Sequence, residues 1–288
     1  GRLGLALSGL DQLSDDLVPR TPRRVVAISF NVFDNFTRPR DTVPGDAYRY
    51  YGLCAPPSRT AEHEPHTRLS LDQALERLKR SLRQIWTMGV GHQREWAQFL
   101  DTTGLFVSEP GLENILADAP PEPGRFDAKL DAFIQRLARA SSGHQFLVFV
   151  VTALVESVRK DTVVLLDEME AHIHPRLLST VIRLLSDFLS ERDAFAILAT
   201  HSALVLQEIP ASAIRIIRLS DRHPIIKDYP GESFGESLDE IIHEAFGLDE
   251  SDRNYVSLLR RLAKETHERA DIERQFKGLG LGARMLLR

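Results

Sequence analysis

The spacing of apolar residues along the chain predicts helices in several segments. Within each of them, leucine and other apolar residues recur three or four positions apart, the spacing that places side chains on one helix face. The predicted helices are residues 1–16, 70–87, 95–100, 111–117, 142–158 and 175–190, with a helical tail over 231–288. The segment 142–158 is apolar on nearly every side, so this helix is expected to be buried.

Shorter apolar runs between these helices predict strands. They end at polar residues, and several are rich in the β-branched side chains that strands favour. The predicted strands are residues 23–30, 48–53, 162–166, 195–199, 214–219 and 224–227. Strand, helix and strand follow one another over 162–199, a pattern typical of parallel strands joined by a crossover helix. The predicted fold class is α/β with a largely parallel sheet, in which the strand at 195–199 is expected to be buried.

Changes in composition divide the chain into four predicted segments. A polar loop follows residue 55, and Pro120, Pro121 and Pro123 interrupt the helical region beyond it. The segments are a first part of the α/β core at 1–55, a mainly helical insertion at 56–135, a second part of the core at 136–230 and the helical tail at 231–288.

The composition narrows the classes of protein to which the chain can belong. Hydrophobic residues make up 43% and charged residues 27% of the 288 residues, as in ordinary globular proteins. The net charge of -5 gives no global positive field for nucleic acid, although the mildly basic segment 251–288 leaves a local contact with nucleic acid open. No apolar run reaches the ~20 residues that cross a bilayer, and no signal peptide opens the chain. The single cysteine, Cys54, excludes an intrachain disulfide, so we expect a cytoplasmic protein without a membrane partner.

An acid pair at the end of the strand at 162–166 is the strongest chemical signal. Asp167 and Glu168 are neighbours on an extended chain, so their side chains point to opposite sides and need different partners. In phosphoryl chemistry, Asp167 would hold Mg²⁺ through water, while Glu168 would orient and deprotonate the attacking water. Taken alone, the pair is equally compatible with a solvated strand end.

Two further segments bear on the same chemistry. His201 follows the strand at 195–199, and in a parallel neighbour it would lie level with the acid pair, within reach of a γ-phosphate or an attacking water. Residues 141–145, Ser-Ser-Gly-His-Gln, open the helix at 142–158, where free N–H groups and the helix dipole favour an anion. Each has a simpler alternative, a histidine packed at a strand end and an ordinary helix cap.

Joined in this order and spacing, the three motifs resemble the second half of an ATP-binding-cassette ATPase head. The matching positions are the signature motif at Ser141, Ser142, Gly143, His144 and Gln145, the Walker B acids Asp167 and Glu168, the loop after them at 170–175, and the switch histidine His201. The form of these motifs is similar to SMC-like and overcoming-lysogenization-defect-like heads. Within that branch they resemble ATPases of bacterial anti-phage systems, including the Septu ATPase PtuA and its retron-associated relatives, as does Gly-Glu-Ser-Phe-Gly-Glu-Ser at 231–237.

This resemblance implies a P-loop NTPase-like fold, ATP and Mg²⁺ as cofactors, and heads that work in pairs. ATP would lie between the phosphate-binding loop of one subunit and the signature motif, residues 141–145, of the other. The implied protein is an ATP-hydrolysing regulatory subunit, at least a head-to-tail dimer, that controls a partner effector such as a nuclease in phage defence. The alternative is an SMC-like ATPase of DNA repair or maintenance, but its long coiled coil does not fit the short, proline-broken segment 56–135.

The sequence departs from the family pattern in one important respect. No Gly-x-x-x-x-Gly-Lys-Ser/Thr loop occurs in the 288 residues. In the family this loop opens a helix, and that helix precedes the strand that corresponds to residues 23–30. The predicted helix at 1–16 occupies the same place in this sequence. We therefore expect the loop just before Gly1, with a pseudo-ATPase scaffold as the alternative.

Overall fold

The computed structural model describes residues 22–30, 47–54, 68–109, 123–220, 223–248, 254–265, 269–276 and 278–286. The chain divides into two compact units, Gly1–Val205 and Leu206–Arg288. The end of the α/β core at residue 230 stays a prediction from the sequence. The helices predicted at 1–16 and 111–117 lie outside the described residues.

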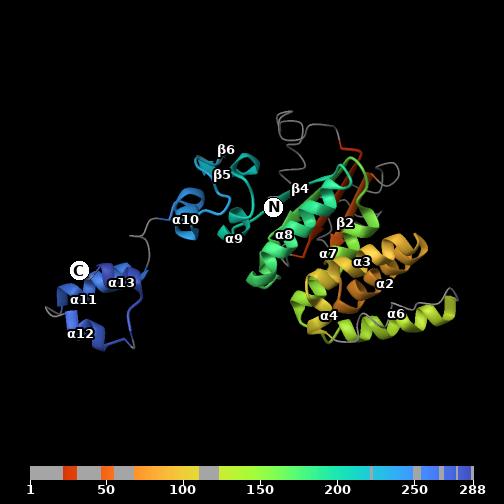
Figure 1. Ribbon diagram of the computed structural model, residues 1–288, viewed down its shortest axis with the longest axis horizontal. Helices are drawn as coiled ribbons and strands as arrows, with labels where there is room; N and C mark the ends of the chain where they lie inside the picture. The colour runs from red at the N-terminus through yellow and green to blue at the C-terminus, as the bar shows by residue number, and fades with distance from the viewer. Residues whose placement is uncertain are drawn as a thin grey trace. The chain divides into compact units, whose positions relative to one another are not determined.

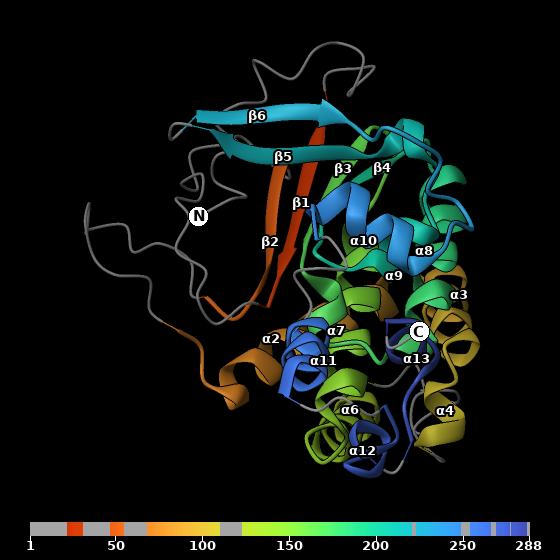
Figure 2. The same ribbon diagram turned by 90° about the vertical axis from the view of Figure 1, so that its left-hand side faces the viewer.

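The first unit is built on a parallel sheet. Its strands are β1 (Arg24–Ser29), β2 (Tyr48–Gly52), β3 (Thr162–Asp167) and β4 (Phe195–Ala199), in the order β2-β1-β3-β4 (Figure 2). All three pairings are parallel, so the carboxyl ends of the strands lie along one edge of the sheet. The α/β class and the parallel sheet predicted from the sequence are confirmed.

Strand β4 differs from the prediction in its burial. The apolar sequence predicted a buried strand, but Ile197 is 36% exposed and its neighbours in β4 are only half-buried or exposed. In the described sheet β4 is an edge strand, paired on one side with β3. Hydrophobicity alone does not distinguish an edge strand from a central one, which is why the prediction was wrong.

Helix α7 (Ser142–Ser157) forms the centre of the first unit. One side packs on the sheet, where Phe146 and Phe149 contact Phe30 at the end of β1, and other sides meet α2 (Leu71–Thr87) and α3 (Val90–Thr102). Ten of its residues are buried, which confirms the prediction of a buried helix. At a contact with α3, the indole Nε1 of Trp96 donates a hydrogen bond to Oγ1 of Thr152 at 2.9 Å.

The helices before α7 form an outer layer beside it (Figure 1). Besides α2 and α3 they include α4 (Leu105–Ser108) and α6 (Pro123–Leu137), which packs on α2. Ser70 caps α2, because its hydroxyl accepts the backbone N–H of Gln73 and the side chain of Gln73 accepts the N–H of Ser70. This layer is the region that the sequence assigned to a helical insertion.

Helix α8 (Pro175–Ser190) returns the chain from β3 to β4. It begins at Pro175, the start predicted from the sequence, with His174 as its cap, and it packs against β4. Phe188 near its end meets Phe99 of α3 edge-on, and Arg192 just beyond it pairs with Glu95. These contacts hold α8 against both the sheet and the helical layer. A short 3₁₀ turn, Met169–Ala171, lies between β3 and α8.

Helix α9 (Ala203–Gln207) spans the boundary between the units. The second unit continues with the 3₁₀ turn Ala211–Ala213 and an antiparallel pair, β5 (Arg215–Ser220) and β6 (His223–Asp228). Both strands were predicted, but they form a sheet separate from the parallel one. Among the described residues, four helices follow: α10 (Leu238–Phe246), α11 (Asn254–Glu265), α12 (Arg269–Arg274) and α13 (Leu281–Leu286), which confirms the helical tail. Across the described ranges, no helix has both the length and the apolar character needed to cross a membrane.

Candidate functional site

The parallel register of β3 and β4 brings two predicted site residues together. Asp167 is level with Ala199, and the backbone N–H of Glu168 donates to the carbonyl of Ala199 at 2.9 Å. Two residues beyond Ala199, Nε2 of His201 lies 3.7 Å from Oε1 of Glu168. Their side chains are 60% and 39% exposed, so both can reach a molecule at this edge of the sheet. The site therefore lies where parallel sheets commonly place their ligands, at the carboxyl ends of the strands.

The backbone at Glu168 has an unusual conformation. Its φ of 46° and ψ of 44° are left-handed, a region that non-glycine residues seldom occupy. The carbonyl of Glu168 then accepts the N–H of Ala171 at 3.0 Å, which closes the 3₁₀ turn after the strand. The chain thus changes direction at the residue expected to act as the base, a place where backbone strain is often found.

Glu170 links the acid loop to the histidine loop. Its Oε1 accepts hydrogen bonds from Oγ1 of Thr200 at 2.6 Å and from the backbone N–H of His201 at 2.8 Å. Oγ1 of Thr200 in turn accepts the N–H of Ser202 at 3.0 Å. The sequence analysis placed Glu170 in the loop after the acids and gave it no role. The signal in the sequence was an acid two residues after the acid pair. The hydrogen-bond partners of Glu170 lie about thirty residues further along the chain, so this spacing did not identify them.

The signature segment begins α7 with its two serines exposed. Ser141 is the cap, and its hydroxyl accepts the backbone N–H of His144 at 3.3 Å. Gly143 lies against the loop that follows the acids, because a Cβ built on it would stand 2.9 Å from the carbonyl oxygen of His172. The signature turn is therefore in direct backbone contact with the acid loop of the same chain.

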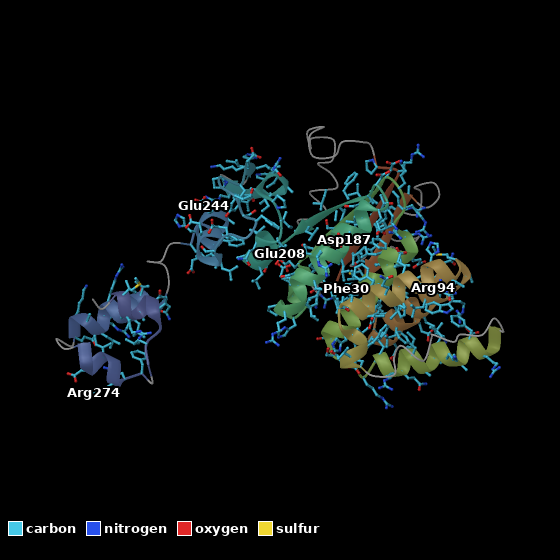
Figure 3. All side chains as sticks on the ribbon, viewed as in Figure 1. Phe30, Arg94, Asp187, Glu208, Glu244 and Arg274 are labelled. Carbon is cyan, nitrogen blue, oxygen red and sulfur yellow. The ribbon has the colours of Figure 1, made fainter. Side chains whose placement is uncertain are left out.

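An aromatic cluster reinforces this contact. The imidazole of His172 stacks on Phe146, with ring centroids 4.7 Å apart, and meets Phe30 edge-on at 6.5 Å (Phe30 is labelled in Figure 3). Phe30 also contacts Phe146, so residues from β1, α7 and the acid loop share one cluster. Burial in this cluster lowers the pKa of His172 below its usual 6.5, which favours the neutral imidazole.

The other predicted signature residues make contacts within the chain. The side-chain amide of Gln145 donates to the carbonyls of Ala138 and Ala140, at 3.3 and 3.1 Å, and so fastens the turn between α6 and α7. Nδ1 of His144 lies 3.2 Å from a carboxylate oxygen of Glu109. Of the five residues, Ser141 and Ser142 are the exposed ones and Gly143 is the one in contact with the acid loop.

The chemistry of this edge suits a magnesium ion bound with few protein ligands. Asp167 ends β3 half-buried, and Ser29 ends the neighbouring strand β1 with a buried hydroxyl that has no hydrogen-bond partner among the described residues. Carboxylate and hydroxyl oxygens are ligands that Mg²⁺ accepts, usually together with waters and substrate phosphates. Within the described ranges, no three His, Cys, Asp or Glu side chains converge on a metal position.

Comparison with known proteins connects this geometry to ATPases. Residues 71–207 match the family described as "AAA domain, putative AbiEii toxin, Type IV TA system". The match includes all three motifs, and it also includes the helices that the sequence analysis treated as an insertion.

A second comparison extends over nearly the whole chain. The chain is 32% identical over 277 residues to Protein ea59 of Escherichia phage lambda. That alignment covers 92% of this chain and 52% of the relative, so the chain spans about half the length of the curated relative it matches. The four-stranded parallel sheet and the family match agree with an α/β fold of the P-loop NTPase-like kind, in which Glu168 of the acid pair lies beside His201.

Proposed function

We propose that this protein is an ATP-hydrolysing regulatory subunit whose heads pair when ATP is bound and separate after hydrolysis. The observation that carries the proposal is the pair of Glu168 and His201, 3.7 Å apart at the carboxyl edge of a parallel sheet and directly after Asp167. A carboxylate and an imidazole at that distance suit a water that has to be both oriented and deprotonated.

Each residue has a distinct role in this proposal. Asp167 would hold Mg²⁺ through water, and the ion supplies charge neutralisation for the phosphates. Glu168 accepts the proton of the attacking water, for which an exposed carboxylate on a fixed turn is suited. His201 donates a hydrogen bond to the γ-phosphate, where negative charge builds up during transfer. None of these roles requires burial, in keeping with the 39% exposure of Glu168.

The signature segment acts on the nucleotide of a second subunit. Ser141 and Ser142 are exposed at the first turn of α7, where free N–H groups and the helix dipole attract a phosphate. With Gly143, they would contact a γ-phosphate gripped by the partner, so ATP would hold two heads together. His144 and Gln145 support this turn from within the chain. The proposal requires a phosphate-binding loop, a motif that these 288 residues do not contain.

We further propose that the switch controls a partner effector, a nuclease, in an anti-phage system of the Septu or retron-associated kind. The support is the form of the motifs at 141–145, 167–175 and 200–202 together with the segment 231–237. The relative Protein ea59 is encoded by Escherichia phage lambda, so a gene related to this one is carried by a phage. Copurification of a nuclease with the complete gene product would support this step.

The test of the ATPase proposal is Glu168→Gln in the complete gene product. The amide keeps the size of the side chain and cannot accept the proton, so we expect kcat to fall by about 10²-fold or more while ATP still binds. The paired heads should then persist with ATP, as measured by size-exclusion chromatography with light scattering. Glu191→Gln is the matched control, because Glu191 is an exposed residue at the end of α8, outside the site. Hydrolysis at the parental rate in Glu168→Gln would refute the role of Glu168.

A further inference from the structure

We propose that Glu170 is the positioning residue that holds His201 beside Glu168, an assignment that rests on the proposed ATPase function. Glu170 belongs to the 3₁₀ turn Met169–Ala171, directly after the acid pair. Its carboxylate contacts the hydroxyl of Thr200 and the backbone of His201, and no described hydrogen bond joins it to the side chain of Glu168 or His201. It acts through the loop Thr200–His201–Ser202, which follows β4.

The contacts of Glu170 account for the conformation of the histidine loop. One carboxylate oxygen accepts both the hydroxyl of Thr200, at 2.6 Å, and the backbone N–H of His201, at 2.8 Å. A hydroxyl can donate one hydrogen bond and accept others with its lone pairs. The hydroxyl of Thr200 therefore donates to Glu170 while it accepts the N–H of Ser202 at 3.0 Å. Each residue of the loop is therefore tied, directly or through Thr200, to one charged acceptor. Hydrogen bonds to a charged acceptor are stronger than those between neutral groups.

The position of β4 in the sheet explains why a side chain is needed here. The described sheet pairs β4 on one side only, and the ladder to β3 ends with the bond from Glu168 N–H to the carbonyl of Ala199. Beyond Ala199, no further strand pairing within the described sheet orders the backbone that carries His201. Glu170 supplies the next bonds across the same gap, from the β3 side, and so extends the alignment of the two strands by two residues.

The two carboxylate oxygens of Glu170 differ in their contacts. Oε2 is buried and has no hydrogen-bond partner among the described residues, so the hydrogen bonds that the carboxylate makes to those residues are the two that Oε1 accepts. A glutamine at this position keeps an Oε1 that can accept both hydrogen bonds. An alanine removes the acceptor and leaves two donors without a partner.

The first test is a set of variants of the complete gene product assayed for ATP hydrolysis. We expect Glu170→Ala to lower kcat by about ten- to a hundredfold, because a misplacement of about 1 Å costs up to 10²-fold, with little change in ATP affinity. Glu170→Gln and Thr200→Ser keep the acceptor and the hydroxyl and should stay within a fewfold of the parent. Thr200→Val should lower kcat in the same direction as Glu170→Ala. Glu191→Ala is the control for loss of a carboxylate outside the site.

The double variant Glu170→Ala/His201→Ala provides a readout that general destabilisation would not produce. If Glu170 acts through His201, the double variant is no slower than His201→Ala alone. Additive losses would mean that Glu170 works independently of His201 and would overturn the assignment. Full activity of Glu170→Ala, with His201→Ala impaired, would overturn it as well and would leave the proposed function intact.

The second test does not depend on hydrolysis. Without nucleotide, amide hydrogen exchange measured by NMR should show the N–H of His201 exchanging at least about tenfold faster in Glu170→Ala, the loss expected for a bond to a charged acceptor. The amide of Leu165, in a strand paired on both sides, is the internal control. An unchanged rate at His201 contradicts the positioning role. If the parent itself fails to hydrolyse ATP, or His201→Ala hydrolyses it normally, the proposed function fails, whatever the exchange shows.

Discussion

Replacing Gly143 with alanine tests the contact between the signature turn and the acid loop. Gly143 is the second residue of α7, and a Cβ there would lie 2.9 Å from the carbonyl oxygen of His172. Real Cβ atoms essentially never come within 3.0 Å of a neighbouring heavy atom, and here the neighbour is backbone, which cannot swing aside as a side chain can. The alanine must therefore displace either α7 or the acid loop by several tenths of an ångström.

The expected loss of stability follows from two opposing effects. Overpacking of this kind costs about 1–3 kcal/mol, whereas exchanging glycine for alanine in a compatible helix stabilises by about 0.4–1 kcal/mol through the unfolded state. A net loss of roughly 0.5–2 kcal/mol of unfolding free energy remains for Gly143→Ala. Because the displaced loop carries Glu168 and Glu170, we also expect ATP hydrolysis to fall.

Gly91→Ala is the matched control, since Gly91 is also the second residue of its helix, α3, and no atom lies within 4 Å of the position that its Cβ would take. Urea unfolding followed by tryptophan fluorescence measures both variants, because the two tryptophans, Trp86 and Trp96, lie in α2 and α3 of the first unit. The midpoint should fall for Gly143→Ala and stay level or rise for Gly91→Ala. Equal, stabilising shifts in the two variants would refute the close contact between Gly143 and His172.

Two further substitutions test the packing around α7. Thr152→Val keeps the shape of the side chain but leaves the buried indole N–H of Trp96 without its acceptor. The unfolding free energy should therefore fall by about 1–3 kcal/mol in the same urea assay. An unchanged midpoint would contradict a stabilising role for this hydrogen bond. Burial lowers the pKa of His172 below 6.5, so the unfolded chain binds a proton at this residue more readily than the folded one. The contribution of His172 to the unfolding free energy should therefore be fully present above about pH 6.5 and decline as the pH falls below it. His172→Phe keeps an aromatic ring against Phe146 and should lose less stability between about pH 7.5 and pH 5.5 than the parent, whereas identical losses would mean that other groups cause the decline.

Local patterns in the sequence were sufficient to predict most elements of the fold. Apolar spacing identified α2, α7 and α8, because this signal acts within a few residues along the chain. The parallel sheet followed from alternating strands and helices. That sheet then predicted the approach of His201 to Glu168, since parallel strands of similar length end at the same edge.

The features that the sequence did not predict depend on contacts between distant residues. Glu170 acquires its partners only when β4 lies beside β3, and the internal role of Gln145 depends on the turn that precedes it. Whether β4 is a central or an edge strand depends on the strands that pair with it in the folded sheet. Strands β5 and β6 pair with each other in a separate sheet, and this pairing also depends on the tertiary structure. Apolar content is similar in both situations, so it predicts the strands without predicting their neighbours.

The left-handed backbone of Glu168 implies a compromise between folding and activity at this position. Glycine or asparagine would adopt the same φ of 46° more readily, so selection for stability alone would favour either of them over glutamate. Neither of these residues can accept a proton from water. If Glu168 is the base, the protein retains there a residue that its own backbone disfavours, and a search for more stable variants would be expected to select substitutions that inactivate the enzyme.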